Sequence, residues 1–295
     1  MYGFYRERDY ANDFPYTDLA CERRRADLTV DGIEYKREIS DGGTWERISV
    51  TTPEGARSIG RPMGRYDTLE VSRMDLLDME AVEDAVEEIA RELCYMCDKG
   101  GIMPERLLVV GLGNPRLTPD SVGYVCAKEI RATMHIKEFD ESFFEQLECS
   151  EIAVITPDVM ATSGIDASVS VRGVCNMIKP TAVIAIDAIA SRSAERLGTT
   201  IQISDTGIIP GSGLGNGHAA LNRETLGVPV IAVGVPTVID SRMFWLDAQD
   251  GLEGVRYPEG ARRSMFVSPK EINEIVDVSA RIISGGINQA FGLCL

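Results

Sequence analysis

The chain has 295 residues, and 44% of them are hydrophobic, which is enough to build a sizeable core in one large domain or two smaller ones. Its 46 acidic and 30 basic residues give a net charge of −16, which argues against direct binding to nucleic acid or to an anionic membrane. Seven scattered cysteines indicate reduced thiols, and no apolar run is long enough to span a bilayer, so we expect a cytoplasmic protein.

The first part of the chain predicts exposed strands. Residues 19–73 mix charged stretches with the alternating pattern T-W-E-R-I-S-V-T-T, which is typical of an antiparallel β flank. Residues 74–99 then have apolar side chains at helical spacing, and two glycines follow as a stop signal. Cys94 and Cys97 lie near the C-terminal end of that helix, where the helix dipole does not favour a thiolate, so we interpret them as packing residues.

Strands and helices alternate after residue 101. Apolar runs predict strands at 106–113, 151–157, 181–187, 199–205 and 229–236, with helices at 121–134 and 167–179. Ser268 and Pro269 are typical of the start of a C-terminal helix. The sequence therefore predicts an α/β fold, with a mostly parallel central sheet covered by helices and an antiparallel β flank near the N-terminus.

Four carboxylates follow predicted strands. Asp187 comes directly after a buried run, Asp120 follows the loop G-L-G-N-P-R-L-T-P, and Asp205 and Asp240 end two further strands. The ends of parallel strands are where open α/β sheets place their chemistry, and a carboxylate beside a core is costly unless it is bonded or functional. Asp120 and Asp187 are our catalytic candidates, although Asp120 could also be a simple helix cap and the pattern alone does not choose among the four.

Histidine is scarce, since His135 and His218 are the only two. A Ser-His-Asp triad or a histidine-rich zinc site would need one of them, so we expect acid–base chemistry without a metal or other cofactor. His218 ends a glycine-rich loop in which Gly211, Gly213 and Gly215 would let backbone amides approach an anion. We interpret this loop as a turn beside the active site, because it lacks the spacing of a nucleotide-binding motif.

Several blocks together resemble a known family. They are T-D-L-A-C-E at 17–22, G-L-G-N-P-R-L-T-P-D at 111–120, A-V-I-A-I-D-A-I-A-S-R at 182–192, T-I-Q-I-S-D-T-G-I-I-P-G-S-G-L-G-N at 200–216, L-G-V-P-V-I-A-V-G-V-P-T-V-I-D at 226–240 and M-F-V-S-P-K-E-I-N at 265–273. In this order they resemble the germination proteases of spore-forming bacteria. The resemblance implies an atypical aspartic endopeptidase that degrades small acid-soluble spore proteins, with Asp120 and Asp187 as the catalytic pair and no metal.

The same resemblance implies a zymogen that processes itself. Cleavage would fall between Asp18 and Leu19, within an acid-hydrophobic-Ala-x-Glu site that mimics the substrate, so that residues 1–18 form a propeptide and 19–295 a single peptidase domain with its α/β core at 101–295. The resemblance further implies a homotetramer in the spore core. The chain departs from the family pattern at Gly217-His218, where a basic residue is common, and in a short region at 241–264.

Two alternatives remain open on the sequence. A hydrogenase-maturation-type endopeptidase would sense a bound metal through carboxylates and His135 or His218, and loss of activity on chelation would favour it. A non-catalytic module could instead bind a nucleotide or another anion through the glycines of residues 211–217. A thermal shift on adding nucleotide, with no proteolysis, would favour that reading.

Overall fold

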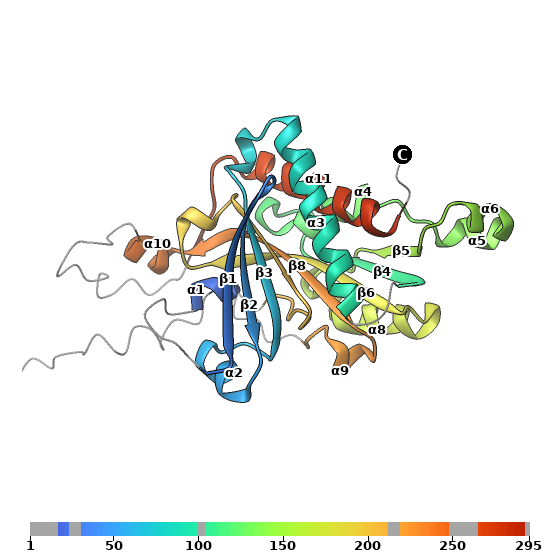
Figure 1. Cartoon of the computed structure of the whole chain (residues 1–295), viewed down its shortest axis with the longest axis horizontal. Coiled ribbons are helices and arrows are strands. Elements are labelled where there is room, and N and C mark those ends of the chain that lie inside the picture. Colours follow the sequence, from blue (N-terminus) through green and yellow to red (C-terminus); the bar gives the residue numbers. More distant parts are fainter. Residues whose placement is uncertain (1–16, 24–30, 100–103, 212–218, 248–264, 293–295) are drawn as a thin grey trace, which may run out of the picture.

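A computed structural model describes residues 17–23, 31–99, 104–211, 219–247 and 265–292 (Figure 1). Within these residues the strands form one sheet in the order β1-β2-β3-β7-β8-β6-β4-β5, and β9 pairs with the end of β8. The strands are β1 (Ile33–Ser40), β2 (Gly43–Val50), β3 (Gly64–Glu70), β4 (Arg106–Gly111), β5 (Glu151–Ile155), β6 (Ala182–Ser191), β7 (Thr200–Ser204), β8 (Val230–Asp240) and β9 (Phe266–Val267).

The sheet is mixed. Strands β8, β6, β4 and β5 run parallel to one another, whereas β1, β2, β3 and β7 are joined in antiparallel pairs that continue onto β8. The predicted α/β fold, with a parallel centre and an antiparallel flank near the N-terminus, is confirmed. Because β3 pairs with β7, the flank extends the same sheet.

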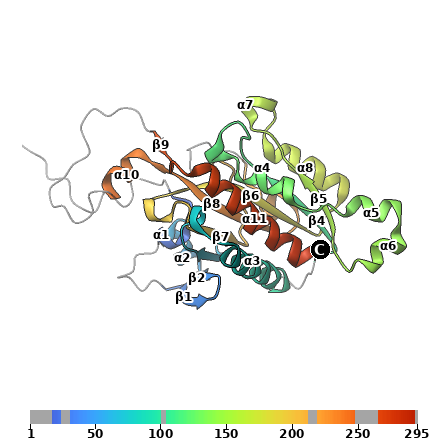
Figure 2. The same ribbon diagram turned by 90° about the horizontal axis from the view of Figure 1, so that it is seen from above.

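Helices cover both faces of the sheet. The longest, α3 (Met79–Lys99) and α11 (Ile272–Phe291), lie side by side with α4 (Val122–Glu129) on one face, and α8 (Ala167–Ile178) lies on the other (Figures 1 and 2). The remaining helical segments are α1 (Ala20–Arg23), α2 (Pro53–Ile59), α5 (Met134–Phe139), α6 (Glu141–Gln146), α7 (Met160–Ser163), α9 (Arg223–Leu226), α10 (Ser241–Asp247) and the 3₁₀ turns η1 (Met74–Leu76), η2 (Thr118–Asp120) and η3 (Ala194–Arg196). Across the described residues, none of these helices has the length and apolar character that a membrane crossing requires.

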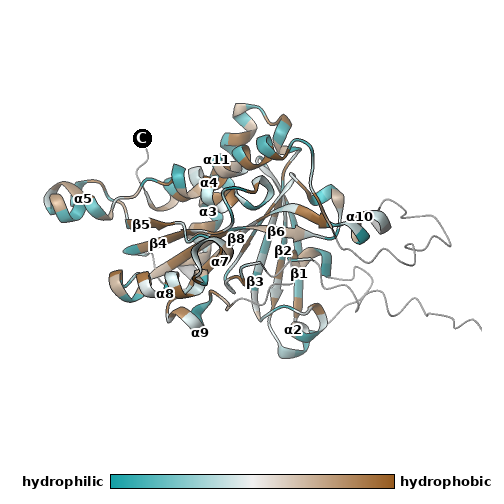
Figure 3. Ribbon diagram, turned by 180° about the vertical axis from the view of Figure 1, so that it is seen from behind, coloured by the Kyte–Doolittle hydropathy of each residue, from teal (hydrophilic) through white to brown (hydrophobic). Residues whose placement is uncertain are grey.

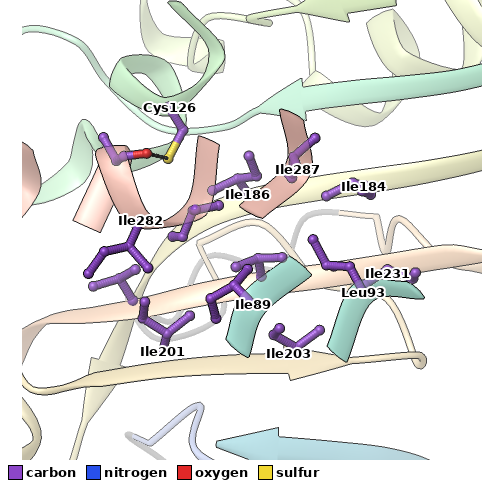
Figure 4. Packing of buried hydrophobic residues seen from close by; sticks show 14 of the residues in the cluster. Ile89, Leu93, Cys126, Ile184, Ile186, Ile201, Ile203, Ile231, Ile282 and Ile287 are labelled. Atoms are coloured by element: carbon purple, nitrogen blue, oxygen red, sulfur yellow. Dashed lines mark hydrogen bonds between the residues drawn. The ribbon is translucent and has the colours of Figure 1, made fainter. Parts of the chain in front are cut away.

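The main core lies between the sheet and the pair α3 and α11. Isoleucines from three strands, among them Ile184, Ile203 and Ile231, face Ile89 of α3 and Ile287 of α11 (Figure 4). All of these side chains are buried, and their burial is the main favourable term in holding the layers together. Figure 3 shows hydrophobic residues running along β4 and β5 between the helical layers.

Two predicted helices are shorter than expected. The run at 74–99 is divided into η1 and α3, because Leu77 is extended between them, with φ −66° and ψ 135°. Helix α4 ends at Glu129, since Ile130 is also extended. The helical spacing of apolar residues continues through both breaks, so the sequence pattern did not reveal them.

The C-terminal helix begins later than the sequence predicted. Ser268 does not cap it, because its hydroxyl donates to the carbonyl of Thr237 at 2.9 Å, and α11 starts at Ile272. Ser268 thus fastens the segment before the helix to β8.

Candidate active site

Asp187 lies within β6, not at the strand exit that the sequence predicted. The strand continues to Ser191 because Ala188 to Ser191 keep pairing with β8. Its neighbour β4 ends earlier, with Gly111 opposite Ile186, so no strand lies beside Asp187 on that side. Ile184 and Ile186 point into the core with α3 and α11, which places Asp187 on the opposite face of the sheet.

Asp120 lies in η2, in the loop that follows β4. The backbone N–H of Asn114 donates both to the Asp120 carbonyl at 2.8 Å and to its carboxylate Oδ2 at 3.0 Å, which fixes the side chain. Two glycines permit close backbone approaches here: a Cβ on Gly113 would lie 2.0 Å from the Asp120 carbonyl oxygen within the loop, and one on Gly123, at the start of α4, would lie 2.3 Å from the carbonyl oxygen of Ile186 in β6. Thr237 of β8 donates to the carbonyl of Pro119 at 2.6 Å and completes the support.

The structure brings the two predicted aspartates together. Asp120 and Asp187 line one cavity of about 240 Å³, which Asp18 and Gly211 also line. Most of the remaining wall is apolar, including Ile189. Among the described residues that line it, no lysine or arginine is present.

Both aspartates have raised pKa values. Burial, opposed only by the Asn114 N–H, raises the pKa of Asp120 to about 6. Burial also raises the pKa of Asp187 well above its usual range, and the charges of Asp120 and Asp18 raise it further, while the N–H groups of Ala188 and Gly211 act in the opposite direction. Two neighbouring carboxyls without a cation between them do not ionise together readily, which is why the charge of Asp120 raises the pKa of Asp187.

The other two strand-end carboxylates lie elsewhere. Asp205 is exposed and its Oδ1 accepts from the backbone N–H of Arg65 at 2.7 Å. Asp240 is fully buried and forms an ion pair with Arg242 at 3.1 Å. Neither lines the cavity, and each is bound to a structural partner.

The segment that holds the expected processing site is docked at this cavity. The backbone N–H of Asp18 donates to the carbonyl of Ala190 in β6 at 2.9 Å, and the N–H of Ala190 returns a bond to Asp18 Oδ2 at 3.0 Å. The side-chain amide of Gln202 donates to the Asp18 carbonyl at 3.2 Å and accepts from the Ala20 N–H at 2.8 Å. Asp18, the residue before the expected processing site, therefore lies at the cavity that the two aspartates line.

The glycine-rich loop is described only in part. Gly211 lines the cavity and its N–H bonds to Asp187, as a turn beside the site would require. Gly213, Gly215 and His218 lie outside the described residues. His135 is exposed on α5 and does not line the cavity, and no three His, Cys, Asp or Glu side chains in the described ranges are grouped as a metal site needs.

Sequence reasoning missed three contributors to the site: Gln202, Arg61 and the turn of residues 191–193. Gln202 was detectable, because it is the one amide side chain in the predicted strand at 199–205, and the structure leaves it only 8% exposed. Arg61 and the turn gave no signal, because their role depends on contacts with residues far along the chain.

The chain is similar over most of its length to one known family of proteins. The family model of the germination proteases, Peptidase_A25, matches residues 15–255. A germination protease of Caldanaerobacter subterraneus is 34% identical over 93% of this chain and 93% of its own length. One from Clostridium perfringens is 31% identical over 93% of this chain and 94% of its own length, and one from Bacillus cereus is 38% identical over 79% of this chain and 65% of its own.

A solved structure with some similarity is a nickel–iron hydrogenase maturation protease, HycI, from Thermococcus kodakarensis. It is 16% identical, covers 63% of this chain and 94% of its own, and superposes with a TM-score of 0.34, so no functional argument is based on it. The family model and the relatives cover most of the chain, including both aspartates and the docked segment. The chain belongs to the germination protease family, and it is a protease of the spore germination type.

Proposed function

We propose that the chain is an aspartic endopeptidase, made as a self-processing zymogen, that begins the degradation of small acid-soluble spore proteins during germination. The observation that carries the proposal is that Asp18, the residue before the expected cleavage site, is bound to β6 and lines the cavity that Asp120 and Asp187 line. A peptidase that cuts itself has to bring its own peptide bond to its own catalytic groups, and the position of Asp18 supports this.

The raised pKa values support a division of roles within the pair. Burial raises the pKa of Asp120 to about 6 and that of the more deeply buried Asp187 well above its usual range, so Asp120 ionises first and the remaining proton stays on Asp187. Ionised Asp120 takes a proton from a water molecule, and the oxygen of that water attacks the carbonyl carbon of Asp18. Protonated Asp187 polarises the carbonyl and then protonates the nitrogen of Leu19, so the C–N bond breaks and leaves a carboxylate and an amine.

Further parts of the proposal concern processing and assembly. Residues 1–18 are the propeptide, and residues 19–295 are a single peptidase domain that assembles as a homotetramer in the spore core. Light scattering on the purified chain tests the assembly, since a mass other than four subunits contradicts it. Mass analysis of the processed chain tests the boundary, since any N-terminus other than Leu19 moves it.

The substrate is tested with the processed enzyme and a purified small acid-soluble spore protein. We expect fragments that start at the hydrophobic residue of an acid-hydrophobic-Ala-x-acid site. A chain that is made to start at Leu19 and carries Asp187→Asn should give no fragments. If the enzyme has trimmed itself to Leu19 but leaves the spore protein intact, the substrate part of the proposal is wrong and the self-processing part stands.

A further inference from the structure

Residues 17–22 are bound to the body of the protein by groups other than the two aspartates. Leu19 and Ala20 are fully buried, although they belong to a short segment near the N-terminus. Ala20 packs against Ile48 and Tyr66 on the face of the flank that α2 also covers. A segment fixed so closely at a protease active site shows how a cleavable chain lies there.

Gln202 holds the backbone across the bond to be cut. Gln202 of β7 and Asp187 of β6 both pair with Gly234 of β8, so the three residues form one row on the same face of the sheet. Two strand spacings separate the Cα atoms of Gln202 and Asp187 by about 10 Å. A Cβ on Gly234 would lie 2.8 Å from the side chain of Ile189, so glycine leaves room for that side chain between the two.

A second set of groups receives an acidic side chain downstream of the bond. The Glu22 carboxylate accepts from the Ser191 hydroxyl at 2.7 Å, the Arg192 N–H at 2.7 Å and the Ser193 N–H at 2.9 Å. Successive backbone N–H groups in such a turn are a common way to bind a carboxylate. The turn directly continues β6, so its distance from Asp187 is fixed by the strand.

A third contact receives the acidic side chain upstream of the bond. Arg61 lies 3.4 Å from Asp18 Oδ1 and donates to the carbonyl of Thr17 at 2.8 Å. The other carboxylate oxygen of Asp18 is held by the Ala190 N–H. Arg61 therefore contacts both the carboxylate of Asp18 and the neighbouring backbone carbonyl.

We propose that Arg61, Gln202 and the turn of residues 191–193 form the substrate-binding groove of the enzyme. The groove selects protein segments with one acidic residue directly before the cleaved bond and a second one four residues after it. This inference rests on the proposed function, because it takes the bond between Asp18 and Leu19 as the one that is cut. The docked segment occupies the groove that a substrate in trans needs, so the two compete.

The first test measures self-cleavage of the full chain by intact mass over time. Glu22→Gln removes the charge that the turn binds, and we expect cleavage at least about tenfold slower than in the wild type. Glu80→Gln makes the same chemical change on the exposed side of α3 and is expected to cut at the wild-type rate. If the wild type cuts and Glu22→Gln cuts equally fast, the acidic subsite is wrong, whereas a wild type that never yields a chain starting at Leu19 refutes the proposed function first.

A second test separates recognition from folding. Ser191→Ala removes one donor to Glu22, so we expect it to slow cleavage in the wild-type chain and to have little effect in a chain that already carries Glu22→Gln. Synthetic peptides of residues 12–26, with Glu or Gln at position 22, are then supplied to the processed enzyme. The inference predicts that the Gln peptide has a higher KM with a similar kcat, and equal KM values for the two peptides would overturn it.

Discussion

Two buried carboxyl pairs lie in different parts of this molecule, and their neighbours differ. Asp67 of β3 and Glu92 of α3 lie beneath the flank, where Arg47 contacts both carboxylates and Arg65 contacts both from the other side. Asp120 and Asp187 share a cavity whose described lining contains no cation. A pair bridged by arginines is part of an ion network that holds the flank together, whereas a pair held by neutral N–H groups has no cation to fix its charge and can pass a proton.

The size of the nearby cavity does not distinguish the two pairs. A larger cavity, about 660 Å³, lies over the flank pair and is lined by Arg47, Arg65 and Glu92, compared with about 240 Å³ at the aspartates. Burial and contact with Asp67 raise the pKa of Glu92 to about 7, although Arg47 opposes that shift. What distinguishes the aspartate pair is that Asp18, the residue before the expected processing site, lines the same cavity.

The largest expected effect is on the stability of the flank. Asp67→Asn removes one partner of a fully buried ion network, and we expect it to lower the free energy of unfolding by about 3 kcal/mol. Asp187→Asn should leave the unfolding midpoint unchanged or raise it, because it removes a carboxyl that lacks a cation. Urea unfolding of both variants checks this, and an equal loss of stability in the two would remove the distinction between the pairs.

Variants of Gln202 test the comparison of the two pairs further, because Gln202 belongs to the surroundings of the Asp120 and Asp187 pair alone. Gln202→Leu removes the donor to the Asp18 carbonyl while it keeps a side chain of similar size, so we expect self-cleavage to slow by about 100-fold. Gln202→Glu keeps the shape but loses the amide donor and should also be slow. Near-wild-type cleavage in a folded Gln202→Leu chain would show that the contact of Gln202 with the Asp18 carbonyl is not needed for cleavage.

The pH dependence gives the smallest effect. The acid limb of the self-cleavage rate should bend near pH 6, where the more acidic site of the pair gains its proton, and the rate should then fall roughly tenfold per pH unit. The sign follows from the mechanism, since a doubly protonated pair has no base. A rate that rises as the pH falls from 7 to 4 would contradict the assignment of Asp120 as the ionised partner.

Much of the central sheet could be predicted from the sequence, and the limits have physical causes. The apolar run at 181–187 predicted β6, but its continuation to Ser191 depends on pairing with β8, which no local pattern reports. Asp120 and Asp187 were both named, yet their meeting depends on Gly113, which lets the loop fold back onto Asp120, and on Gly123, which lets α4 approach β6. Long-range contacts of this kind, like that of Glu22 with the turn at 191–193, appear only in the folded chain.

The most direct test of the account is self-cleavage of wild type, Asp120→Asn and Asp187→Asn, followed by intact mass and accompanied by unfolding curves. The account predicts that the wild type yields a chain that starts at Leu19, and that both variants fold and remain uncut, with rates lowered at least about 1,000-fold. A folded variant that still cuts at near the wild-type rate would show that its aspartate is structural and would contradict the paired-aspartate mechanism.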